Sequence, residues 1–143
     1  MSENRSGRKV NGEKDKNLSD DLQTETEEFR ICKEKIRSVL ERGDELDDMT
    51  LEGFKHLIDG KIEESKRCFD SLSEKKNSPM VFYGQGIINL LLGDFQQAVR
   101  FFERSISLRP DFDEAWYEKG VALYELDRSQ EALQCWKKAR ENG

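Results

Sequence analysis

A spaced pattern of small and aromatic residues, repeated three times, most constrains how this chain can fold. From about residue 45 onward, a glycine is followed twelve residues later by a small residue and, four residues after that, by a large aromatic one. The three sets are Gly53, Ser65 and Phe69; Gly86, Ala98 and Phe102; and Gly120, Ala132 and Trp136. The glycines lie 33 and 34 residues apart, which indicates a repeated structural unit of that length.

Each unit is predicted to be two antiparallel helices joined by a tight turn. Glycine inside a helix costs about 1 kcal/mol relative to alanine, so three at a fixed period indicate a close approach of the paired helices. We expect the small residue to lie opposite the glycine and the aromatic residue to fill the space one turn further on, between pairs. Seven residues after the glycines, Gly60, Gly93 and Asp127 mark the turns, where a positive φ or a short polar side chain is favoured.

Capping residues help to place the helix ends. Ser78 is a good N-cap and Pro79 follows it at the first helical position. Pro110 ends the preceding helix, and Asp111 or Asp113 is predicted to cap the next one. The predicted helices span about 45–58, 62–75, 79–92, 95–108, 113–126 and 129–141.

The N-terminal part of the chain has a different character. Residues 1–18 are polar and charged and are expected to be a disordered tail. Residues 20–42 are predicted to form a helix, because apolar residues follow one narrow stripe. The stripe consists of Leu22, Phe29, Cys32, Ile36 and Val39. The expected domains are therefore a tail (1–18), an N-terminal helix (19–43) and a repeat domain (44–143) of units 46–78, 79–112 and 113–143.

Residues 46–143 resemble the tetratricopeptide repeat, a 34-residue helix-turn-helix unit with the signature W-x2-L-G-x2-Y…A-x3-F…P. The second unit carries this resemblance in Phe82, Gly86, Gly93, Ala98, Phe102 and Pro110, and the third in Trp116, Gly120 and Ala132. The usual tyrosine after the glycine is replaced by His56, Asn89 and Leu123. The resemblance implies an all-α, right-handed solenoid of three repeats plus the N-terminal helix.

The resemblance also implies a concave groove, lined by the first helix of each pair, that binds a peptide or helix of a protein partner. The candidate groove residues are Phe54, Met80, Tyr83, Ile87, Tyr117 and Val121, with Glu114 and Glu118 at an acidic edge. This set suits apolar anchors and some basic residues on the partner, although several of its members could instead pack between helices. One subgroup of the family clamps a C-terminal carboxylate with Lys, Asn and Arg. Glu114 and Glu118 stand at two of those positions, so we do not expect that mode.

The position of the 20–42 helix is left open by the sequence. We favour a cap on the first repeat, because terminal repeats need covering. The helix could also lie in the groove or pair with a copy of itself. The last repeat has no capping helix after it and leaves Leu133 and Trp136 partly uncovered. A homodimer formed through this repeat or the N-terminal helix is the alternative function.

Composition argues against several other classes of protein. The net charge is −6, and residues 18–143 hold 19 basic and 27 acidic side chains, so nucleic acid and anionic membranes are not expected partners. There is no run of 18 apolar residues and no secretory signal. Three distant cysteines and one histidine argue against disulfides, a metal site or a cofactor. We expect a cytoplasmic protein without enzymatic activity, since no nucleophile–base pair or phosphate loop is present.

Overall fold

Seven α-helices and no strand make up the residues that this computed structural model describes, 26–42 and 46–142. The predicted tail and the start of the predicted 20–42 helix lie outside these residues. The helices are α3 (Glu27–Glu41), α4 (Asp48–Ile58), α5 (Ile62–Ser73), α6 (Pro79–Leu92), α7 (Phe95–Leu108), α8 (Asp113–Glu125) and α9 (Ser129–Asn142). The all-α prediction is confirmed, and the six repeat helices begin and end within three residues of their predicted bounds.

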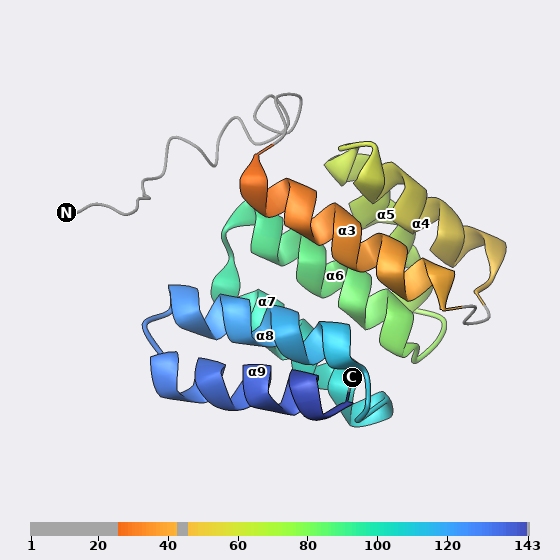
Figure 1. The fold of residues 1–143 in the computed structure, drawn as a ribbon. Helices are drawn as coiled ribbons and strands as arrows, with labels where there is room; N and C mark the ends of the chain where they lie inside the picture. The colour runs from red at the N-terminus through yellow and green to blue at the C-terminus, as the bar shows by residue number, and fades with distance from the viewer. Residues whose placement is uncertain (1–25, 43–45, 143) are drawn as a thin grey trace.

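The repeat helices form three successive pairs, α4 with α5, α6 with α7, and α8 with α9, and each pair packs on the next (Figure 1). This is the arrangement of a helical solenoid. One continuous apolar core runs through all three pairs. Because each pair covers its neighbour, the first helices α4, α6 and α8 share one face of the molecule.

The turns inside the pairs have the backbone conformation that the sequence predicts. Gly60, Gly93 and Asp127 have φ values of 79°, 83° and 62°, and no other described residue has a positive φ. In each turn, the residue that follows the positive-φ residue donates its backbone N–H to the carbonyl five residues before it. These bonds are Lys61 to His56, Asp94 to Asn89 and Arg128 to Leu123, at 2.8–2.9 Å. This is the hydrogen bond of a helix ending in a left-handed residue, so the three turns are equivalent. Aspartate replaces glycine in the third turn because its short polar side chain tolerates this conformation.

The repeated glycines make room for the aromatic rings sixteen residues later. A Cβ atom on Gly53, Gly86 or Gly120 would lie 2.9, 2.5 or 2.4 Å from the ring of Phe69, Phe102 or Trp136, respectively. The ring of Phe69 also lies against Gly84 of the following pair, where a Cβ would approach it to 2.5 Å. Phe69 thus fills space between two pairs, as expected. All three rings also pack on the glycine of their own pair, which is the reason for that glycine.

The predicted N-cap is correct for α6, the first helix of the second pair, but not for α8, the first helix of the third pair. The Ser78 side chain accepts from the Val81 N–H at 3.3 Å, as predicted. The predicted aspartate cap of α8 is wrong, because Phe112 occupies the N-cap position and no side chain caps that helix. Phe112 is fully buried, and its ring lies 4.9 Å from that of Tyr83. Burial of this ring therefore decides where α8 begins.

Helix α3 lies on the face formed by the first helices. Figure 1 shows it along α6, and it contacts α4 and α6 directly. Arg42, at its C-terminal end, pairs with Asp113 at the start of α8, so α3 runs antiparallel to that helix. The cap interpretation that we favoured from the sequence is therefore wrong, and α3 lies in the groove, which was one of its alternatives.

We predict that Gly86→Leu lowers the free energy of unfolding by more than about 2 kcal/mol, because the new side chain overpacks against Phe102. Chemical denaturation of the variant and the parent chain gives this difference. Gln96→Leu, at an exposed site on α7, is the control and should have little effect. Equal stability of Gly86→Leu and the parent would contradict the close approach in the second pair.

Candidate functional site

The candidate groove residues come together on the shared face of α4, α6 and α8, beneath α3. Six of the eight are buried, and two of α8 are half-buried. The buried residues are Phe54, Met80, Tyr83, Ile87, Glu114 and Glu118, and the half-buried ones are Tyr117 and Val121. The groove therefore exists as a surface of the repeats, but in this structure α3 covers it.

Tyr83 joins the groove to the core of the repeats. Its ring centroid lies 4.9 Å from that of Phe112, 6.0 Å from that of Phe102 and 6.2 Å from that of Phe54. Burial, with Glu118 close by, raises the pKa of the Tyr83 hydroxyl well above its usual value. This hydroxyl has no hydrogen-bond partner within the described part of the chain. Tyr83 is thus a core residue whose polar end points toward the acidic side of the groove.

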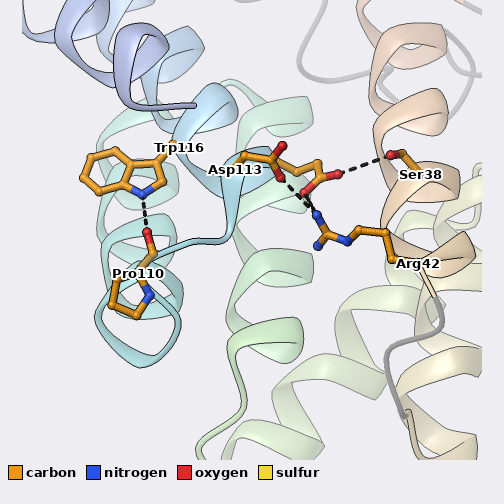
Figure 2. Close-up of polar contacts among 6 residues, drawn as sticks. Ser38, Arg42, Pro110, Asp113 and Trp116 are labelled. Atoms are coloured by element: carbon orange, nitrogen blue, oxygen red, sulfur yellow. Dashed lines mark hydrogen bonds and ion pairs between the residues drawn. The ribbon is translucent and has the colours of Figure 1, made fainter. Parts of the chain in front are cut away.

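The N-terminus of α8 holds the C-terminal end of α3 through charged hydrogen bonds. The Arg42 guanidinium donates to Glu114 at 2.7 Å and to Asp113 at 3.0 Å, and the Ser38 hydroxyl donates to Glu114 at 3.2 Å (Figure 2). Arg42 also lies over the Phe112 ring, 5.5 Å from its centroid. Burial and the neighbouring Asp113 raise the pKa of Glu114, while Arg42 opposes the shift.

Glu118 is a buried carboxyl group in the middle of the groove. It is only 1% exposed, and its Oε2 atom has no hydrogen-bond partner among the residues described. Burial raises its pKa to about 8, and Lys35 of α3 partly opposes this shift. The Lys35 ammonium lies 4.2 Å from the centroid of the Tyr117 ring, an attractive cation–π geometry. The groove therefore combines apolar contacts with acidic groups that favour cationic or hydrogen-bond-donating ligands.

The sequence-based selection of site residues did not include the α3 side chains that fill the groove. Phe29, Cys32, Ile36 and Val39 are buried there, and they are spaced by three, four and three residues. This spacing is typical of a helix that packs along a seam between other helices. The spacing shows only that α3 packs on other helices, and the signal for the groove is the pairing of the basic Arg42 with the acidic residues of α8.

The last pair of helices has large apolar side chains that are exposed. Leu133 is 58% exposed, Tyr124 is 57% exposed and Trp136 is half-buried. The Trp136 indole N–H donates to the Tyr117 carbonyl at 3.1 Å, so the ring is held in place. The sequence-based expectation that Leu133 and Trp136 are partly uncovered is confirmed.

The geometry defines a protein of repeated helix pairs, and comparison with known proteins shows which repeat family it resembles. Residues 83–142 match the tetratricopeptide repeat family. This match covers most of α6 and all of α7, α8 and α9, and the pair α4–α5 before it has the same glycine, turn and aromatic geometry. Tetratricopeptide repeats bind protein partners, which indicates a role in protein–protein interaction.

Two relatives are similar to part of this chain. An uncharacterized protein of Methanocaldococcus jannaschii is 34% identical over 55 residues, which cover 38% of this chain and 64% of the relative. A peroxisomal targeting signal receptor of Eremothecium gossypii is 32% identical over 78 residues, which cover 54% of this chain and 13% of the receptor. The matched segment thus spans less than two thirds of either relative.

None of the helices in the described residues is both long enough and apolar enough to cross a membrane. Within the same residues, no three His, Cys, Asp or Glu side chains gather as a metal site would require.

Glu118 makes stability depend on pH. Its folded pKa of about 8 lies above the ordinary value of 4.5, so the folded chain binds more protons than the unfolded chain between these pH values. Stability should therefore fall as pH rises from about 4.5 through about 8. We predict that Glu118→Gln, which mimics the protonated carboxyl, removes this loss and makes the variant more stable than the parent by about 1 kcal/mol or more at pH 8.

Urea denaturation at several pH values measures both profiles. Glu64→Gln, at an exposed site on α5, is the matched control and should follow the parent. If the free energy of unfolding changes equally with pH in Glu118→Gln and in the parent between pH 5 and 8, the pKa of this carboxyl is not raised.

Proposed function

We propose that this chain is an interaction module that binds an amphipathic helix of a protein partner in the groove formed by α4, α6 and α8. The observation that carries the proposal is the seating of α3 in this groove. A helix is already bound there by apolar contacts and ion pairs, so α3 indicates the kind of ligand that the groove accepts.

The floor of the groove supports apolar anchoring. Phe54, Tyr83 and Ile87 are fully buried beneath α3, and the α3 residues that meet this face are themselves buried. Buried aromatic and aliphatic side chains at the centre of an interface supply most of its binding energy. A ligand helix would therefore present apolar residues with the spacing of Phe29, Ile36 and Val39.

The charge of the groove supports a cationic ligand. Asp113 and Glu114 already bind Arg42, and the Glu118 carboxyl lies between them and the other end of the groove. A C-terminal carboxylate placed here would meet acidic groups, so the carboxylate-clamp mode is not part of this proposal. For the same reason, nucleic acid and anionic membranes are poor ligands for this face.

The relative from Eremothecium gossypii is named as a receptor for a peroxisomal targeting signal. Its similarity supports a binding role for the shared repeats, and the ligand here remains the helix class argued above. We propose no catalytic role for the chain, in keeping with the tetratricopeptide repeat as a scaffold for protein interactions. All three cysteines are free thiols, as the reducing cytoplasm maintains, and we propose that compartment.

Self-association is a second candidate function. The α3 helix of another copy would meet the same groove residues, so two chains could exchange this helix. The exposed Leu133 and Tyr124 offer a further apolar contact. Light scattering at two concentrations distinguishes the candidates. A dimer that exchanges α3 dissociates on dilution, so its average molar mass falls, whereas a chain that uses its own α3 is monomeric at both concentrations.

We test the groove with a fluorescent peptide that has the sequence of residues 26–42. Because α3 occupies the groove, the full chain carries Ile36→Asp, which places a charge at a fully buried α3 position. We predict that adding Tyr117→Ala weakens peptide binding about tenfold, because the ring under Lys35 is lost. Fluorescence anisotropy measures the affinity.

Tyr124→Ala, at an exposed site on the same helix, is the control and should leave the affinity unchanged. A peptide of the same composition with its apolar residues respaced should not bind. If the two peptides bind alike, or if Tyr117→Ala has no effect, the groove is not the binding site.

A further inference from the structure

Helix α3 fills the groove incompletely. An open pocket of about 320 Å³ remains beside its N-terminal half, lined by Ile31 and Cys32 of α3 and by Leu90, Glu118 and Val121 of the repeats. A second pocket of about 500 Å³ flanks its C-terminal half, where Lys35, Ser38 and Tyr117 are among the lining residues. A bound helix with larger side chains facing these two pockets would bury more apolar surface than α3 does.

Helix α3 also leaves buried polar groups of the groove without partners. The Glu118 Oε2 and Tyr83 Oη atoms are both buried and have no hydrogen bond within the described residues. Cys32 of α3, a weak donor, lines the same pocket as Glu118. A buried carboxyl without a partner costs free energy that a donor on the ligand would recover.

The two ends of α3 bring different charges to α8. Near the C-terminal end, Arg42 and Ser38 bind Asp113 and Glu114. Near the N-terminal end, Glu27 and Glu28 line the same pocket as Glu118 and Glu125. Burial raises the pKa of Glu118 and Glu28 raises it further, so the negative charge of Glu28 disfavours the ionised form of that buried carboxyl.

We propose that α3 is an internal competitor, and that a partner helix displaces it by carrying a hydrogen-bond donor where α3 has Cys32 and a cation where α3 has Arg42. This inference rests on the proposed function and adds the partner's chemistry and the means of regulation. The partner helix runs in the direction of α3. Its donor reaches Glu118 ten residues before the cation that binds Asp113 and Glu114, and apolar residues stand at the positions of Phe29, Ile36 and Val39.

Tethering makes α3 an effective competitor. A segment of the same chain has an effective concentration in the millimolar range, so the groove of the free chain is mostly filled. If α3 is seated in about nine of ten molecules, the apparent affinity for a partner falls about tenfold. A partner overcomes this only through contacts that α3 lacks, and the Glu118 Oε2 atom offers one.

The test compares two versions of the peptide of residues 26–42, one with Cys32→Gln and one with Cys32→Leu, on the full chain. Glutamine and leucine are similar in size, but only glutamine donates to Glu118. We expect the glutamine peptide to bind about tenfold more tightly, and we expect this preference to vanish when the chain carries Glu118→Leu. Equal affinities, or a preference that survives Glu118→Leu, would overturn the proposed recognition.

The competition is tested on the same peptides with two α3 variants of the full chain. Ile36→Asp should raise the affinity at least about tenfold by unseating α3, whereas Arg37→Asp, at the neighbouring exposed position, should not. If Ile36→Asp binds no better than the parent, α3 is not a competitor, although peptide binding to both chains would still support the proposed function. If no peptide binds any chain, the proposed function itself fails.

Hydrogen exchange on the parent chain gives a readout that does not depend on a variant folding. Binding of the glutamine peptide should remove protection from the α3 amides, while the α6 amides stay protected. Continued protection of α3 at saturating peptide would show that both helices bind at once and would overturn the displacement.

Discussion

The contact between each aromatic ring and the glycine sixteen residues before it determines the rest of this structure. A Cβ atom on this glycine would come within 3 Å of the ring, so the two helices can approach this closely only where the residue is glycine. This fixes the point at which the helices of a pair meet. Phe69 touches Gly53 of its own pair and Gly84 of the next, so the same ring also sets how pairs stack. The shared face of α4, α6 and α8, and therefore the groove, follows from this repeated contact.

The repeat could be predicted almost completely from the sequence, because its determinants are local and occur three times. Gly60, Gly93 and Asp127 identify turns through backbone conformation alone, and Ser78–Pro79 identifies a helix start. The position of α3 could not be predicted in this way. Its apolar stripe fits any apolar face, and the choice depends on Arg42 meeting Asp113 and Glu114, 71 and 72 residues away.

The face that carries the candidate site could be predicted from the sequence, but the burial of its residues could not. Groove positions inferred from the family resemblance do lie on one face, but the burial of Tyr83 results from packing against Phe54, Phe102 and Phe112, which come from different parts of the chain. Phe112 likewise takes the cap position of α8 and leaves Asp113 to bind Arg42. Tertiary packing thus changes the role of residues whose local signals are correct.

The seating of α3 in the groove is measured most directly by a double-mutant cycle on Arg42 and Glu114. The free energy of unfolding is determined for the parent, Arg42→Ala, Glu114→Gln and the double variant. Because the guanidinium lies 2.7 Å from a carboxylate that is 8% exposed, we predict a favourable coupling of about 0.5–3 kcal/mol. Additive effects of the two substitutions would mean that α3 does not lie against α8 in solution.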